Sequence, residues 1–191
     1  MLSHLLLLAT VASADTAPVV LAGAPVPAPR ARVNRRALTP LESAMSRPKA
    51  YSADSMVLDK SERRLTMFHR GRAVRSYEVA LGNTPVGPKT RRGDGKTPEG
   101  LYFIEGRNSR SKYHLSLRIS YPAAKDVAVA ARRRVSPGGD IMIHGLPPAF
   151  ATVGALHRQQ DWTEGCVAVT NEEIEEIWRA VPNGARILII P

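Results

Sequence analysis

The single cysteine of this 191-residue chain, Cys166, is the side chain best suited to covalent chemistry. It ends the run DWTEGC (residues 161–166) and has no second cysteine with which to form an internal disulfide. His144 ends an apolar, strand-like run 22 positions earlier (166 − 144). A free thiol is only a few per cent thiolate at neutral pH, and a histidine within hydrogen-bond reach raises that fraction or takes the proton during attack. We therefore predict that Cys166 is a nucleophile and His144 its base.

Three residues next to this pair are candidates for supporting roles. Gly165 has no side chain to shield the Cys166 backbone N–H, which makes that N–H a candidate donor to an oxyanion. Thr163 is expected to order the loop or to contribute a hydrogen bond, and Gly145 is expected to let the chain turn sharply after the strand. Each prediction has a structural alternative: an inert buried cysteine, an ordinary strand histidine, and simple turn formers at Thr163 and Gly165.

Other side chains near the pair are assigned structural roles. His157 is expected in a surface loop, and Trp162 in packing rather than as a platform for a substrate. Asp161 either orients His144 or serves as a loop and capping residue. His144, His157 and Cys166 lack the close pair of ligands that is typical of zinc sites, so we predict no metal, and we predict no cofactor.

One further motif is rejected as a binding site. The run GDGKT (residues 93–97) is similar to the end of a phosphate-binding loop. The first glycine of that motif would fall at Thr90, and a strand-like run follows where the motif requires a helix. We predict a turn here.

The candidate residues together resemble the signature of a known family. The pair HG (residues 144–145), a gap of variable length and then TxGC (residues 163–166) is similar to the signature of the L,D-transpeptidase catalytic domain, the YkuD family. The version DWTxGC followed by AVTN (residues 161–171) resembles one bacterial subgroup. The run KTPEG (residues 96–100) matches a run that members often carry. The resemblance covers roughly residues 52–191.

The resemblance implies an enzyme of bacterial peptidoglycan. In the family picture Cys166 attacks the bond between the L-centre of a diamino acid and the D-residue after it, and an amine on a second stem peptide takes the acyl group. Many members carry an arginine where this chain has Ala168, so a substrate contact of that arginine is not transferred. Two alternatives stay open: a cysteine hydrolase that cuts wall peptides or releases a wall-linked protein, and a non-enzymatic wall-binding domain. The implied partners are stem peptides, with a wall-linked protein as a second candidate.

The N-terminal part of the chain has the pattern of an exported protein. Residues 1–14 contain a short apolar core that ends in the small-x-small run ASA, which is typical of a cleaved signal peptide and too short to span a bilayer. Residues 15–50 are rich in Pro, Ala and Arg, which predicts a disordered linker. Residues 51–191 are the size of one catalytic domain with its own core. We predict an exported protein of the periplasm or cell wall without a stable membrane anchor.

The formal net charge of +10 suits an anionic polymer as the partner. Residues 15–50 hold six basic and two acidic side chains, or +4, which leaves +6 for residues 51–191. Nucleic-acid binding by stacking requires aromatic residues among the basic ones, and aromatics are only 5% of the chain. Together with export, this argues for the cell wall and against nucleic acid. Solvated basic faces without a partner are the alternative.

Short runs rich in β-formers dominate residues 51–191. An antiparallel meander is predicted from strands near residues 56–58, 65–68 and 73–81, continued near 101–104 and 115–119. Further along the chain we predict a helix over 123–134, a strand over 140–144, a helix over 172–181 behind a capping box at Thr170, and a buried strand over 186–190. The predicted fold is mainly β with a few helices (α+β), and the resemblance implies a β-sandwich-like domain.

Overall fold

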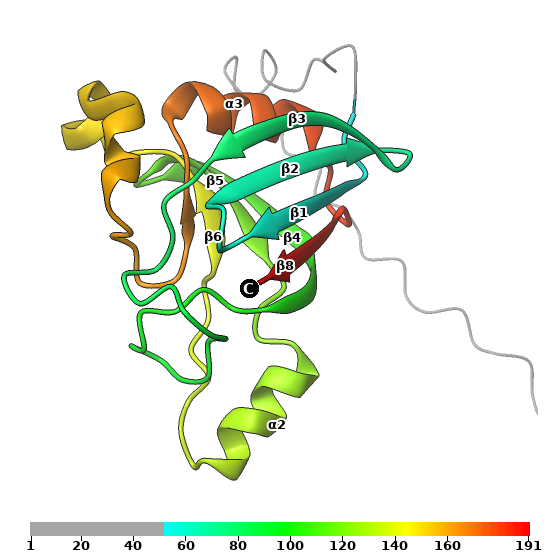
Figure 1. Ribbon diagram of the computed structural model, residues 1–191, viewed down its shortest axis with the longest axis vertical. Coiled ribbons are helices and arrows are strands. Elements are labelled where there is room, and N and C mark those ends of the chain that lie inside the picture. The colour runs from blue at the N-terminus through cyan, green and yellow to red at the C-terminus, as the bar shows by residue number, and fades with distance from the viewer. Residues whose placement is uncertain (1–51) are drawn as a thin grey trace, which may run out of the picture. The chain divides into compact units, whose positions relative to one another are not determined.

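The computed structural model describes residues 52–191, and the predicted signal peptide and linker lie outside the described residues. Figure 1 shows a strand-rich domain with helices at its periphery. The strands are β1 (Ser55–Asp59), β2 (Arg64–His69), β3 (Arg72–Glu78), β4 (Gly100–Ser111), β5 (His114–Ile119), β6 (Met142–His144), β7 (Val167–Ala168) and β8 (Arg186–Ile190). The helices are α2 (Ala124–Arg132), the 3₁₀ segment η1 (Pro148–Gln159) and α3 (Asn171–Ala180). The predicted fold, mainly β with a few helices, is confirmed.

The strands form one curled sheet in the order β3-β2-β1-β8-β4-β5-β6-β7. β1, β2 and β3 form the predicted antiparallel meander. The prediction that this meander continues into the strand starting at Gly100 is wrong. The C-terminal strand β8 lies between β1 and β4 instead, parallel to β1 and antiparallel to β4. The chain leaves the sheet after β3 in a long loop over residues 79–99. The edge of β1 that does not pair with β2 pairs with the C-terminal strand β8.

The long strand β4 bends the sheet and so places the two strands that flank the pocket. Residues 100–103 of β4 pair with β8, and from Ile104 onward β4 pairs with β5. The register shifts between Ile104 and Gly106, and such a bulge bends a strand and increases its twist. β5 then pairs with β6, and β6 with β7. Ala80, just after β3, exchanges two backbone hydrogen bonds with Ala168 of β7, at 3.0 and 2.9 Å, so the two ends of the sheet meet.

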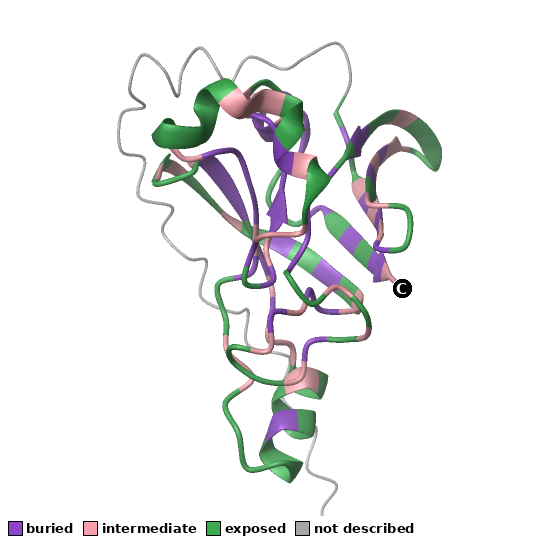
Figure 2. Ribbon diagram, turned by 60° about the vertical axis from the view of Figure 1, so that its left-hand side comes forward, coloured by how far each residue is buried: buried purple, intermediate pink, exposed green. Residues whose placement is uncertain are grey.

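The core lies on the inner face of the curled sheet. Figure 2 shows buried and exposed residues alternating along the strands, as expected when one face of a strand is covered. Met56 and Leu58 of β1 point inward, as does Ile187 of β8. The apolar composition of β8 predicted a buried strand, but only one of its faces is buried. Leu188 is 40% exposed because alternate side chains of the strand face opposite sides and only one side meets the core.

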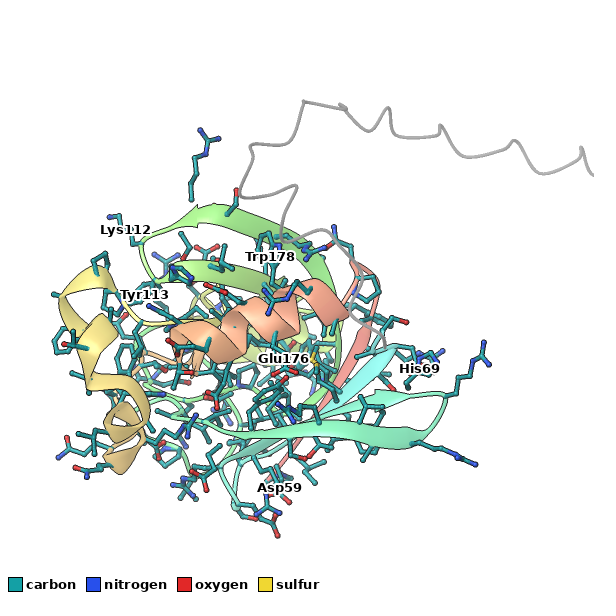
Figure 3. The ribbon with its side chains drawn as sticks, turned by 90° about the horizontal axis from the view of Figure 1, so that it is seen from above. Asp59, His69, Lys112, Tyr113, Glu176 and Trp178 are labelled. Carbon is teal, nitrogen blue, oxygen red and sulfur yellow. The ribbon has the colours of Figure 1, made fainter. Side chains whose placement is uncertain are left out.

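Helix α3 begins at the predicted capping box. The Glu173 N–H donates to Thr170 Oγ1 at 3.3 Å, and the Thr170 N–H donates to the Glu173 carboxylate at 2.9 Å. The predicted apolar stripe of Ile174, Ile177 and Trp178 is buried. In Figure 3 Trp178 lies between α3 and the long strands β4 and β5. The start of α3 lies next to the end of β6, where the Leu146 N–H donates to Asn171 Oδ1 at 2.8 Å.

The other two helices lie at the edge of the domain. α2 falls within the predicted range and is mostly exposed (Figure 2), with Ala130 as its buried residue. η1 follows β6 and occupies the gap between His144 and Cys166, where no helix was predicted. It is kinked at Gly154, whose φ is 52°. Among residues 52–191 no helix combines the length and the apolar character needed to cross a membrane.

Candidate active site

A pocket of about 580 Å³ brings the predicted nucleophile and base together. His144 is the last residue of β6, and Cys166 directly precedes β7, which pairs with β6 in parallel. In the register of these strands His144 lies opposite Ala168, two residues beyond Cys166. The pocket is lined by Lys89, Arg92, Gly93, Tyr113, Gly138, Gly139, Asp140, Ile141, His144, Trp162, Thr163, Glu164 and Cys166.

The loop before Cys166 is held by Thr163. The Thr163 hydroxyl donates to the Cys166 carbonyl at 2.7 Å and accepts the Gly165 N–H at 3.1 Å. Gly165 has a φ of 126°, and a Cβ there would lie 2.5 Å from the Lys96 carbonyl oxygen. Any side chain at position 165 would therefore collide with the backbone of the 79–99 loop. These contacts set the position of Cys166 at the pocket.

The His144 imidazole is held in one tautomer. Its Nδ1 lies 2.7 Å from the Gly145 carbonyl oxygen, which can only accept, so Nδ1 carries the hydrogen and Nε2 has a free lone pair. The Tyr113 ring lies over the imidazole with 4.3 Å between centroids, and the Trp162 ring is 5.8 Å away, edge-on. Figure 3 shows Tyr113 at the tip of the β4–β5 hairpin, beside η1. Two aromatic rings and one carbonyl thus orient the His144 ring.

Burial keeps both reactive groups uncharged. Burial lowers the pKa of His144, against a smaller opposing effect of its hydrogen bond to Gly145. Burial raises the pKa of the Cys166 thiol, although a hydrogen bond from the Met142 backbone N–H and the charge of Lys89 act to lower that pKa. Both shifts favour a thiol and a neutral imidazole over a thiolate–imidazolium pair. The thiol donates to the Asp140 carbonyl oxygen, with 3.4 Å from Sγ to that oxygen.

A second, apolar groove of about 480 Å³ adjoins the pocket. Tyr113 and Trp162 line both cavities. The rest of the groove comes from residues 146–160, mostly from η1, and includes Phe150 and Leu156, which are 57% and 64% exposed. The wall that holds His144 therefore separates a polar pocket from an apolar groove.

The structure places His157 differently from the sequence expectation and shows which of the two expected roles Asp161 has. His157 was expected in a surface loop, and this is wrong: it is only 9% exposed, because η1 folds its ring against Trp162. The Trp162 indole N–H donates to His157 Nδ1 at 3.4 Å. Asp161 does not contact His144. Its carboxylate binds Arg63 at 2.9 Å and accepts the Leu81 N–H at 2.8 Å, which is the loop role.

Position 145 is glycine for a different structural reason from the one predicted. The sequence suggested a sharp turn, but the φ of Gly145 is not among the positive ones. A Cβ at this position would lie 2.6 Å from Asn171 Oδ1 and 2.9 Å from Ile174 Cγ2. Position 145 must be glycine because the start of α3 packs directly against the backbone there.

Sequence reasoning missed three residues of the pocket: Lys89, Arg92 and Tyr113. The GDGKT turn and the KTPEG run marked the 79–99 loop, but nothing in them indicated that the preceding Lys89 and Arg92 line the pocket of Cys166. Tyr113 carried no signal at all, because a tyrosine beside a hairpin turn is ordinary. Only the pairing of β5 with β6 brings it over His144.

The fold and the pocket define a class: a mainly β domain that presents a histidine at the end of one strand and a cysteine just before the adjoining strand. The profile of the family described as “L,D-transpeptidase catalytic domain”, YkuD, matches residues 53–189. The chain belongs to this family.

Individual relatives agree with this assignment. The chain is 30% identical over 128 residues to the Escherichia coli K12 protein named “Putative L,D-transpeptidase YafK”, a match covering 64% of this chain and 44% of the relative. The solved structure of Bd1075 from Bdellovibrio bacteriovorus has a TM-score of 0.52 at 27% identity, covering 76% of this chain and 50% of that one.

A third similarity concerns the fold alone. The Campylobacter jejuni protein Pgp2, described as a helical cell shape determining protein, has a TM-score of 0.53 at 21% identity, covering 77% of this chain and 52% of that one. The chain spans about half the length of each of these relatives.

Proposed function

We propose that this chain is a peptidoglycan L,D-transpeptidase that forms an acyl-enzyme on Cys166 and transfers the acyl group to an amine. The observation that carries the proposal is the shared pocket of Cys166 and a neutral, single-tautomer His144 within a YkuD domain. The substrate is a stem peptide, cut after the L-centre of its diamino acid. The N-terminal export pattern is consistent with action at the cell wall.

Acylation begins with proton transfer from sulfur to His144. The thiol rotates away from the Asp140 carbonyl and gives its proton to Nε2, while sulfur attacks the carbonyl carbon of the diamino acid. The developing oxyanion requires a hydrogen-bond donor. The Gly165 N–H is committed to Thr163, so the adjacent Cys166 N–H is the donor that the loop leaves for the oxyanion. Collapse of the intermediate breaks the C–N bond, and Nε2–H returns the proton to the departing D-residue.

Deacylation repeats the same steps with a new nucleophile. An amine of a second stem peptide attacks the thioester carbonyl, its proton passes to His144 Nε2, and the C–S bond breaks to regenerate the Cys166 thiol. No nucleotide is consumed, because the thioester conserves the energy of the original amide bond. Water in place of the amine would give a hydrolase with the same residues in the same roles.

Intact mass and product analysis test this proposal. The full chain is incubated with a purified disaccharide-tetrapeptide, with and without a second stem peptide as acceptor. We expect a covalent adduct on the wild-type protein that is absent in Cys166→Ala, and crosslinked dimers that depend on the acceptor. His144→Gln should bind the peptide and form the adduct at least about a hundredfold more slowly, as expected for loss of a general base.

The alternatives predict other products from the same incubation. A hydrolase forms the adduct and yields shortened monomers without dimers, whatever the acceptor concentration. A wall-binding domain retains the peptide equally in wild type and Cys166→Ala, with no adduct and no product. Either result, with the protein folded and the thiol reduced, overturns the transferase proposal.

A further inference from the structure

One wall of the pocket is a basic loop with a rigid frame, formed by residues 89–96. The Asp94 carboxylate accepts the N–H groups of Thr90, Arg91 and Lys96 at 2.8, 3.0 and 3.1 Å, and Lys89 Nζ at 2.8 Å. Although burial works in the opposite direction, the hydrogen bonds from Lys89 and the backbone lower the pKa of Asp94 to about 2. The Asp94 carboxylate therefore binds groups of its own loop and fixes the shape of that loop.

Lys89 has donor capacity that the protein itself does not use. Its side chain is only 3% exposed, yet it lines the pocket. An ammonium group has three N–H donors, and Asp94 is its one hydrogen-bond partner among the described residues. A buried ammonium normally satisfies its donors, because leaving them unpaired costs free energy. The remaining N–H groups are thus available to an acceptor that enters the pocket.

Arg92 adds a second cation to the same wall. Its side chain is exposed and lines the pocket, and in the described part of the chain its guanidinium has no hydrogen bond or ion pair. Its backbone is fixed, since the Arg92 N–H donates to the Ser136 carbonyl at 2.8 Å. Gly138 packs closely on both cations: a Cβ there would lie 3.3 Å from Arg92 Cα and 3.5 Å from Lys89 Cε. Both basic residues therefore lie against the same glycine.

The acidic residues of the pocket lie on other segments. Asp140 faces Arg118, with 3.9 Å between Oδ1 and Nη2. Glu164 lies in the cysteine loop, exposed and without an ion pair among residues 52–191. Among the lining residues the cations thus lie on the 89–96 loop, whereas the acidic Asp140 and Glu164 lie on other segments. A ligand group that carries negative charge is expected at the cations.

We infer that Lys89 and Arg92 form a subsite that binds a carboxylate of the substrate. A planar carboxylate suits the fork of N–H groups on a guanidinium, and charge-assisted hydrogen bonds are stronger than neutral ones. The identity of the ligand rests on the proposed function, which makes it a stem peptide. Its carboxylate is either the C-terminal one of the leaving D-residue or, where the diamino acid has a second carboxyl group, the one on that side chain.

Alkylation of Cys166 tests the subsite without relying on the proposed function. Iodoacetate carries a carboxylate and iodoacetamide is its neutral counterpart, and both react with the same thiolate. The ratio of their rates therefore cancels any change in the thiol pKa. We expect Lys89→Met and Arg92→Gln each to lower the iodoacetate:iodoacetamide ratio about fivefold, the size of one charge-assisted hydrogen bond in a partly solvated site.

The matched control is the neighbouring Arg91→Gln. This change removes the same charge from the same loop, but Arg91 does not line the pocket. An unchanged ratio in Arg91→Gln supports the subsite. An equal fall in Arg91→Gln, or no fall in Arg92→Gln, overturns it. Arg92 is exposed, so its variant is expected to fold, and the iodoacetamide rate itself reports whether the pocket is intact.

Amidated peptides then identify the carboxylate. The full chain is assayed with a tetrapeptide, with its C-terminal amide, and with its side-chain amide. We expect one amide to raise KM about tenfold in the wild type, and to raise it much less in Arg92→Gln. Equal KM values for all three peptides overturn the assignment to the stem peptide. If no peptide reacts while the alkylation ratio still depends on Lys89 and Arg92, the proposed function fails and the subsite stands.

Discussion

At the scale of single residues, burial decides how Cys166 and His144 share a proton. Because burial lowers the pKa of His144 and raises that of Cys166, the base is neutral at pH values where an ordinary histidine is half protonated. His144 must be neutral to accept the thiol proton. We therefore predict that kcat/KM with a stem peptide stays high below pH 6.5 and falls only as pH drops through the lowered histidine pKa. A pH profile of kcat/KM measures this.

Removing the Tyr113 ring, which lies over the His144 imidazole, should shift the acidic limb of the pH profile of kcat/KM. Tyr113→Ala exposes His144 to water, so its pKa rises and the limb shifts toward the ordinary value of about 6.5. Phe150→Ala, in the adjoining apolar groove, is the control and should leave the limb in place. A wild-type limb at or above pH 6.5 contradicts the neutral-pair interpretation.

His157 gives a second pH effect, on stability rather than on activity. Burial, and secondarily the charge of Arg158, lower the pKa of His157 to about 4. The unfolded chain then binds a proton more readily between pH 6.5 and 4, so stability is full above that window and is lost as pH falls through it. We predict that His157→Phe reduces this loss by on the order of 2–3 kcal/mol at pH 4.

Urea unfolding at pH 7 and pH 4 measures this difference, and titration of the His157 ring protons by NMR measures the pKa directly. The control is His69→Phe, a histidine far from the pocket, half-exposed on β2. A His157 pKa near that of a solvent-exposed histidine contradicts the prediction, whatever the unfolding data show.

At the scale of elements, the contact between β6 and α3 depends on the missing side chain of Gly145. A methyl group there would meet Asn171 and Ile174 at well under van der Waals distance. We predict that Gly145→Ala lowers the free energy of unfolding by about 1–3 kcal/mol, the usual cost of overpacking a core. Gly139→Ala, where a Cβ meets nothing within 4 Å, is the control and should change stability by under about 0.5 kcal/mol.

The elements themselves were predictable where local signals are strong. The alternation of β1 and β2, and the capping box of Thr170 and Glu173, each identify an element from a few neighbouring residues. η1 was missed because its sequence, with Pro148 at the start and Gly154 inside, has no 3.6-residue period. The position of β8 was missed because its partners, β1 and β4, are distant in the chain, and no local pattern records strand order.

At the scale of the whole molecule, the same limit applies to the site. Cys166, His144, Thr163 and Gly165 were predictable because they lie in one motif and its short upstream companion. The rest of the lining includes residues of the 79–99 loop and Tyr113 at the hairpin tip, which only the curled sheet brings to the pocket. A motif therefore located the candidate pair Cys166 and His144, whereas the residues proposed to select the substrate required the tertiary structure.

The 79–99 loop itself is tied to the sheet by one buried cation. Lys60 follows β1 and is 3% exposed, and its ammonium donates to the Gly87 carbonyl at 2.8 Å, the Thr97 carbonyl at 3.2 Å and Glu99 at 2.7 Å. These bonds join the segments on either side of residues 89–96, the part of the loop that carries Lys89. Lys60→Met leaves the Glu99 carboxylate and two carbonyls without this partner. We predict a loss of about 3 kcal/mol in the free energy of unfolding, as for a broken buried ion pair.

Hydrogen exchange locates the effect of that variant. Backbone amides of residues 79–99 should exchange faster in Lys60→Met, while those of α3 keep their relative protection. Lys112→Met, at an exposed position on the β4–β5 hairpin, controls for loss of one positive charge and should change stability by under about 0.5 kcal/mol. Because the loop carries the proposed carboxylate subsite, Lys60→Met should also lower the iodoacetate:iodoacetamide ratio, although Lys60 does not line the pocket. If Lys60→Met destabilises the protein but leaves this ratio unchanged, the loop holds Lys89 and Arg92 in place without Lys60.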